Sequence, residues 1–193
     1  MGVEYELKFR ATPQILKAIA EVTEGQTCTY QMQTTYYDTP DGSLSQRHYT
    51  LRCRLENDQA VCTLKAPLDG YGRGEWDLNE ADIQKAISEL CKLGAPEDLK
   101  ELTAGGVIPI CGARFTRIAK TVQLQKGVVE IALDEGVLMG GGKEIPLCEV
   151  EVELKDGHPD CCIAYAQQLA IAFGLEPEEK SKFRRAQALY KGE

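Results

Sequence analysis

Val3-Glu4-Tyr5-Glu6-Leu7-Lys8-Phe9 lies at the start of this 193-residue chain and alternates strictly between apolar and charged residues. Successive side chains of a β-strand point to opposite faces, so Glu4, Glu6 and Lys8 share one face. The pattern returns in Glu149-Val150-Glu151-Val152-Glu153-Leu154, with three more carboxylates on one face. Five like charges on two strands repel each other unless cations lie between them. Such an oxygen-rich set favours a divalent metal ion.

The segments between these two strands supply positive charge. Each of four segments has one charged and one apolar face: 50–55 with Arg52 and Arg54, 61–65 with Lys65, 73–78 with Arg73, Glu75 and Asp77, and 128–134 with Glu130 and Asp134. The charged faces therefore combine both signs at high density.

The bulk composition is that of an ordinary globular protein, with 43% hydrophobic and 27% charged residues. The length suits one domain, residues 1–193. A formal net charge of -8 argues against nucleic-acid binding, and no apolar run reaches membrane-span length. The N-terminus reads as a strand and not as a signal peptide, and the eight cysteines form no Cys-x-x-Cys pair. We expect a cytoplasmic protein with reduced cysteines and no zinc site.

The periodicity and the turn residues predict a mixed structure. Strands are expected near 3–10, 31–38, 49–56, 60–66, 72–78, 113–123, 127–134 and 147–155, and helices from Thr12-Pro13, over about 80–93 and 160–173, and from about Pro177. An antiparallel barrel open at both ends would enclose the charged faces and leave the apolar faces to the helices. An open sheet with a solvated charged face fits the alternation as well.

The order of the motifs resembles the CYTH domain family, also called the triphosphate tunnel metalloenzymes. The matching segments are Glu4-Tyr5-Glu6-Leu7-Lys8, Tyr36-Tyr37-Asp38-Thr39-Pro40, Leu51-Arg52-Cys53-Arg54, Thr63-Leu64-Lys65, Arg117, Ile131-Ala132-Leu133-Asp134-Glu135-Gly136, Cys148 to Leu154, and Ser181-Lys182. The resemblance covers about residues 3 to 190. It implies an α+β fold, an eight-stranded antiparallel β-barrel tunnel with helices packed outside.

The resemblance also implies roles for the charged residues. Phosphate-binding positions match Lys8, Arg52, Arg54, Lys65 and Arg117, with Lys182 brought to the tunnel by the C-terminal helix. These residues other than Lys182, together with Glu75 as a water-positioning residue, are the expected catalytic set. The expected metal ligands are Glu4, Glu6, Glu149 and Glu151, with Asp134 and Glu153 as further candidates. The ions would be Mg²⁺ or Mn²⁺, and two of them are expected.

The expected activity is metal-dependent hydrolysis of a small triphosphate, with inorganic triphosphate favoured as substrate. An adenylate cyclase of the same superfamily would use nearly the same charges, but it also needs a base pocket, and no segment of the sequence identifies one. Thiamine triphosphate hydrolysis would need an aromatic surface, and Trp76 is the only tryptophan. A binding module for polyphosphate or nucleotides would not need the carboxylates. The sequence does not indicate an oligomeric state.

Overall fold

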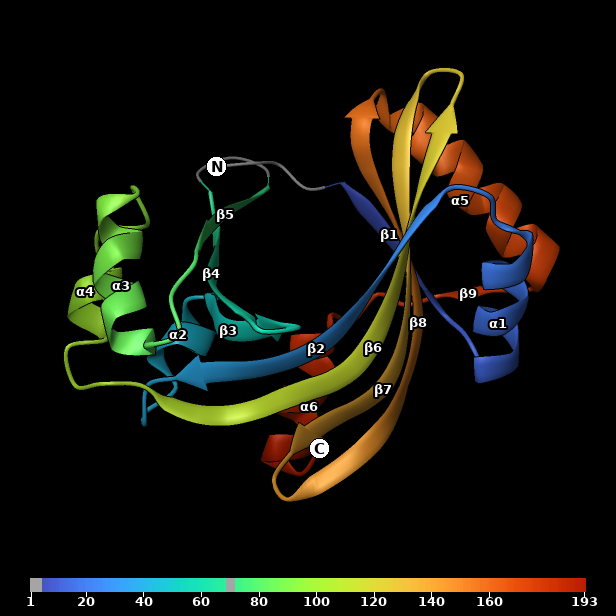
Figure 1. Cartoon of the computed structure of the whole chain (residues 1–193). Helices are drawn as coiled ribbons and strands as arrows, with labels where there is room; N and C mark the ends of the chain where they lie inside the picture. The colour runs from blue at the N-terminus through green and yellow to red at the C-terminus, as the bar shows by residue number, and fades with distance from the viewer. Residues whose placement is uncertain (1–4, 69–71) are drawn as a thin grey trace.

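The computed structural model describes residues 5–68 and 72–193. The described residues form one antiparallel sheet in the order β5-β4-β3-β2-β6-β7-β8-β1-β9. The strands are β1 (Glu6–Arg10), β2 (Gln26–Asp38), β3 (Thr50–Glu56), β4 (Gln59–Pro67), β5 (Arg73–Leu78), β6 (Ile108–Leu124), β7 (Gly127–Gly140), β8 (Lys143–Gly157) and β9 (Glu176–Pro177). The long central strands curve strongly, as Figure 1 shows.

The helices occupy the intervals between these strands. They are α1 (Pro13–Val22), α2 (Ser43–Gln46), α3 (Ile83–Lys92), α4 (Leu99–Leu102), α5 (Pro159–Phe173) and α6 (Lys182–Lys191). Side-chain caps fix several starts, with Thr12, Asp82 and Ser181 accepting backbone N–H donors at α1, α3 and α6. Among the helices of the described part, none is long and apolar enough to cross a membrane.

Two apolar clusters cover the outer face of the sheet. The first joins α1 and α5 to β1, β7 and β8 through Phe9, Ile19, Ile131, Val150, Val152 and Leu169. The second joins α2, α3 and α4 to β3, β4 and β5 through Leu44, Leu51, Leu64, Trp76, Leu90 and Leu99. Figure 1 shows these two groups of helices at opposite ends of the sheet. They bury the apolar side of the alternating strands, so the charged side faces inward.

The C-terminal helix α6 packs on the inner face, against β6 and β7. Its Phe183, Ala186 and Leu189 join a third cluster with Met32, Tyr36, Ala113, Phe115, Leu138 and Leu147. These strand residues occupy the same face as the charged residues, because they are separated from them by even numbers of positions. Helix α6 therefore fills one part of the hollow with apolar side chains.

The expected fold class is confirmed, with differences in detail. The eight expected strands correspond to β1 through β8, but β2, β6, β7 and β8 are longer than expected. Among the described residues no pairing joins β5 to β9, so hydrogen bonds do not close the sheet into a barrel. The expectation that the helices pack outside is wrong for α6. The expected start of the last helix near Pro177 is also wrong. Pro177 belongs to β9 and pairs with Phe9 of β1, and the capping residue of α6 is Ser181.

Gly140 permits the close approach of α6 to the sheet. A Cβ at this position would lie 2.3 Å from the carbonyl oxygen of Ala186 and 2.7 Å from the backbone nitrogen of Tyr190. Both atoms belong to helix backbone, so a side chain can be accommodated only if the whole helix moves.

We therefore expect Gly140→Ala to lower the free energy of unfolding by about 1–3 kcal/mol, the usual cost of overpacking. Urea denaturation measures this loss. Gly105→Ala is the matched control, since no atom lies within 4 Å of its added Cβ. Equal stability of the two variants would show that α6 is not held at this distance.

Candidate active site

Three acidic side chains meet on the inner face of β7 and β8. Asp134 lies directly opposite Glu149 in the ladder, and Glu151 lies two residues further along β8 on the same face. Asp134 and Glu149 are fully buried, and Glu151 is partly buried. One oxygen from each lies within 4.8 Å of the others. We call Asp134, Glu149 and Glu151 the carboxylate trio.

The ammonium group of Lys182 lies among these three carboxylates. Its Nζ is 2.5 Å from Glu149 Oε1, 2.7 Å from Glu151 Oε1 and 2.8 Å from Asp134 Oδ2. An ammonium has three N–H donors, so each carboxylate can accept one. Lys182 is the first residue of α6, where the positive end of the helix dipole also faces the trio.

Two guanidinium groups satisfy the remaining carboxylate oxygens. Arg117 donates to both oxygens of Asp134 at 2.7 Å and to Glu151 Oε2 at 2.5 Å. Arg185, one turn after Lys182 on α6, donates to Glu149 Oε2. All six oxygens of the trio therefore accept from Lys182, Arg117 or Arg185, and three negative charges meet three positive charges.

The contacts between these carboxylates and cations shift the pKa values of Lys182, Glu151 and Glu149. Burial alone would lower the pKa of Lys182, but Asp134 and the two glutamates raise it above its ordinary value. Burial would raise the pKa of Glu151, yet Lys182 and Arg117 hold it well below the ordinary value. The pKa of Glu149 is raised to about 7, because it is buried and Glu151 repels its charge, against the pull of Lys182. The cations thus offset the cost of burying the charge of Glu151, whereas for Glu149 the cost of burial outweighs them.

Phe115 forms an apolar wall beside these cations. Its ring centroid lies 5.4 Å from Lys182 Nζ, 5.8 Å from Arg117 Cζ and 5.9 Å from Arg54 Cζ. These distances fit cation–π contacts. An apolar wall also lowers the local dielectric constant, which strengthens the electrostatic interactions of charges placed there.

A second charged group lies on β3, β4 and β5. Lys65 Nζ is 3.2 Å from Glu75, and Arg52 is 3.7 Å from the same carboxylate. Arg54 donates to Thr34 at 2.9 Å, and burial, followed by repulsion from Arg52, lowers its pKa to about 10. Within residues 5–68 and 72–193, the buried Nε of Arg52 has no hydrogen-bond partner.

Of the remaining predicted residues, Glu6 and Lys8 lie on β1, the strand next to β8, and Glu153 lies on β8, two residues beyond Glu151. Lys8 pairs with Glu6 at 3.0 Å, and Glu6 lies opposite Glu153, which in turn accepts from Lys155 at 2.7 Å. Glu6 and Glu153 are thus near the trio but separate from it. Glu4 lies outside the described residues.

The structure therefore groups the predicted residues into three clusters on one face. Sequence reasoning did not identify Arg185 or Phe115. Arg185 follows Lys182 at helical spacing, and Phe115 precedes Arg117 by two residues on the same strand face, so periodicity could have found both. Glu178 was also missed: it accepts from Arg10 at 2.9 Å and lies 3.6 Å from Arg185, so it is a second carboxylate partner of Arg185 besides Glu149.

The trio has the donor chemistry of a hard divalent cation. Mg²⁺ and Mn²⁺ are bound by carboxylate oxygens, usually few in number, together with water and phosphate oxygens. The trio supplies three such groups within reach of one ion, so these residues fit the expected ion.

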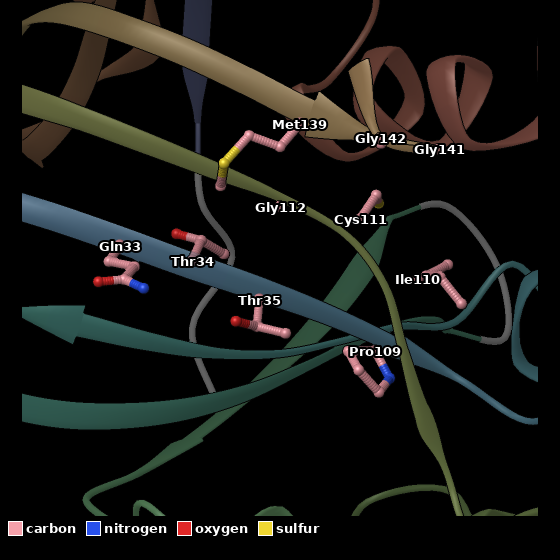
Figure 2. Close-up of a pocket in the computed structure, with 11 residues that line it drawn as sticks. Gln33, Thr34, Thr35, Pro109, Ile110, Cys111, Gly112, Met139, Gly141 and Gly142 are labelled. Carbon is pink, nitrogen blue, oxygen red and sulfur yellow. The ribbon is translucent and has the colours of Figure 1, made fainter. Parts of the chain in front are cut away.

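A separate pocket of about 300 Å³ lies on β2, β6 and β7, on the face of the sheet opposite to the charged inner face. Figure 2 shows Gln33, Thr35, Gly112 and Met139 around it. Of the residues that line it in the described part of the chain, none carries a formal charge. It lacks the groups that phosphate chemistry needs, so the charged inner face is the candidate site.

The chain belongs to the CYTH family, because the model of the CYTH domain matches residues 2–187. An inorganic triphosphatase of Haemophilus influenzae is 28% identical over 194 residues, which cover 96% of this chain and 54% of that protein. The chain thus spans about half the length of this curated relative.

Two solved structures confirm the fold. The PH1819 protein of Pyrococcus horikoshii OT3 has a TM-score of 0.64 at 23% identity, with 98% of this chain and 99% of that chain covered. HpAC1 from Hippeastrum, an adenylyl cyclase candidate described as having a dominant triphosphatase activity, has a TM-score of 0.62 at 20% identity, with 98% and 95% covered.

Removing one charge from the trio should destabilise the fold. Asp134→Asn leaves Arg117 and Lys182 without a full counter-charge in a buried place. We expect the free energy of unfolding to fall by about 3–5 kcal/mol in urea denaturation. Glu89→Gln, which removes the partner of Lys92 in an exposed ion pair, should change it by less than about 1 kcal/mol. A loss below about 1 kcal/mol for Asp134→Asn would contradict the structural role of the trio.

Proposed function

We propose that this chain is a divalent-metal-dependent hydrolase of small triphosphates, and that inorganic triphosphate is cleaved to pyrophosphate and phosphate. One observation carries the proposal: the carboxylate trio shares one face of the sheet with six cationic side chains at motif positions. The six are Lys8, Arg52, Arg54, Lys65, Arg117 and Lys182. The name of the Haemophilus relative supports the same reaction class.

The cations would bind the phosphate chain. A triphosphate carries about four negative charges, and guanidinium groups bind such oxygens bidentately while lysine acts as a point charge. Arg52 offers a buried Nε donor without a partner in the described residues. Arg54 lies two positions after Arg52 on the same face of β3, and it donates to Thr34 of the neighbouring strand β2. These two arginines are therefore positioned to hold oxygens of the transferred phosphoryl group.

The trio would hold the divalent ion, with Glu6 and Glu153 available to a second one. Such an ion, when bound, polarises phosphate oxygens and lowers the pKa of a coordinated water. The carboxylates of the chain orient it and keep the site charged for it, which binding of a phosphate chain alone would not require.

The reaction is an in-line displacement. The water oxygen forms a bond to the terminal phosphorus, and the bond from that phosphorus to the bridging oxygen breaks. Glu75, between Lys65 and Arg52, would orient the water and accept its proton. Arginine and lysine side chains stabilise the charge that develops on the leaving pyrophosphate.

Adenylate cyclisation is the second candidate, because HpAC1 shares the fold and is described as an adenylyl cyclase candidate with a dominant triphosphatase activity. Cyclisation requires the base and the ribose to be held as well. On the inner face, the cluster with Phe183, Tyr36 and Leu189 fills space next to the cations. That packing favours a substrate without a nucleoside.

A substrate panel tests the proposed function. Inorganic triphosphate, ATP and thiamine triphosphate are supplied with Mg²⁺ or Mn²⁺, and phosphate, pyrophosphate and cyclic AMP are measured. We expect the highest kcat/KM with inorganic triphosphate, no turnover with EDTA, and cyclic AMP as a trace product at most. Robust cyclic AMP formation with little free phosphate would replace hydrolysis by cyclisation.

Arg54 provides a mutational test of the same site. Arg54→Ala should lower kcat on inorganic triphosphate by about a hundredfold or more, the scale for loss of one transition-state donor. Arg54→Lys should also be impaired, because a bidentate fork becomes a point charge. Arg114→Ala, which removes a largely exposed arginine of the outer face, is the matched control. Near-wild-type turnover of Arg54→Ala would remove this residue from the catalytic set.

A further inference from the structure

The position of Lys182 conflicts with metal binding at the trio. Its ammonium donates to the three carboxylates, and the oxygens that it contacts belong to the same three residues that could hold a metal ion. Two cations cannot occupy one position, and at a separation of a few ångströms they repel strongly inside a protein. An ion that enters the trio must therefore displace the ammonium or bind against it.

We propose that Lys182, assisted by Arg117, is an exchangeable counter-cation: it neutralises the trio until a divalent ion replaces it, and it then binds a phosphate oxygen. This inference rests on the proposed function. It adds that one side chain serves the metal position and the substrate position in turn, so metal ion and triphosphate each strengthen the binding of the other.

The backbone around Lys182 allows this exchange. Helix α6 is fixed to the sheet by the close contact of Gly140 with Ala186. It is also fixed at its far half, where Gln187 donates to Ser45 at 2.6 Å. A lysine side chain has a flexible four-carbon stem, so the ammonium can move while the helix keeps its place.

Arg185 differs from Lys182 in its surroundings. Its guanidinium contacts Glu149 and also lies 3.6 Å from the buried Glu178, which accepts from Arg10. Arg185 therefore has two carboxylate partners, of which only Glu149 belongs to the trio. It keeps its charge compensated whether or not the trio binds an ion, and we assign it the role of a fixed positioning residue for Glu149.

The test is a titration with Mn²⁺ alone, in the absence of any triphosphate, followed by electron paramagnetic resonance and calorimetry. Lys182→Met removes the competing charge and keeps the volume of the side chain. We expect this variant to bind Mn²⁺ on the order of tenfold more tightly than the wild type. Loss of an ordinary substrate-binding lysine would not tighten the binding of a metal ion.

Arg10→Met is the matched control. Arg10 lies in the same row of the sheet as Glu149 and carries the same charge, but its bond is to Glu178 and not to the trio. It should change Mn²⁺ affinity by about twofold or less if contact with the trio, and not net charge, decides the effect. If Lys182→Met does not fold, the Mn²⁺ titration is carried out on Arg117→Gln, and the same tightening of Mn²⁺ binding is expected.

A second titration uses non-hydrolysable imidotriphosphate on the Mn²⁺-loaded proteins. Lys182→Met should bind it more weakly than the wild type, by about tenfold. Unchanged or weaker Mn²⁺ binding by Lys182→Met, relative to wild type, would overturn the proposal. If Mn²⁺ binding tightens as expected but no triphosphate is hydrolysed, the proposed function fails and the competition between Lys182 and the ion stands.

Discussion

Three carboxylates buried side by side are the constraint on which this structure depends. Asp134 and Glu149 have no exposed surface, so their charge cannot be stabilised by bulk water. The fold supplies cations instead, from β6 through Arg117 and from α6 through Lys182 and Arg185. The C-terminal helix is therefore part of the electrostatic balance and not simply an outer layer.

The same constraint connects stability with the proposed chemistry. A buried ion cluster is weak evidence for stability, since well-packed apolar residues often do as well. Here three cationic side chains balance three carboxylates whose oxygens could also bind a divalent ion. Such an arrangement is better explained by function than by stability. Phe115 belongs to this account, because its ring borders three of the cations and is itself buried. The low dielectric surroundings strengthen every charge interaction at the site.

Strand periodicity predicted the alternation of charged and apolar faces, because it assigns each side chain to a face, and the family resemblance supplied the tunnel fold and the roles of the cations. Asp134 and Glu149 lie on the predicted charged faces of their strands, whereas Arg117 was expected at the site only from the resemblance. Periodicity does not say which charges pair across strands. The cations between the glutamates were therefore predicted to be metal ions, whereas the structure places Lys182 and Arg117 there. Periodicity alone also does not place α6, because an amphipathic helix fits either face; only the resemblance indicated that this helix brings Lys182 to the tunnel.

The position of the Lys182 ammonium is the central claim, and a crystal structure with Mn²⁺ and imidotriphosphate tests it most directly. Anomalous scattering locates the ion without reference to the protein model. The account predicts an anomalous peak within bonding distance of Asp134, Glu149 or Glu151, with Lys182 Nζ within hydrogen-bond distance of a phosphate oxygen. A structure in which Lys182 keeps its three carboxylate partners while the ion and the triphosphate lie elsewhere would contradict it.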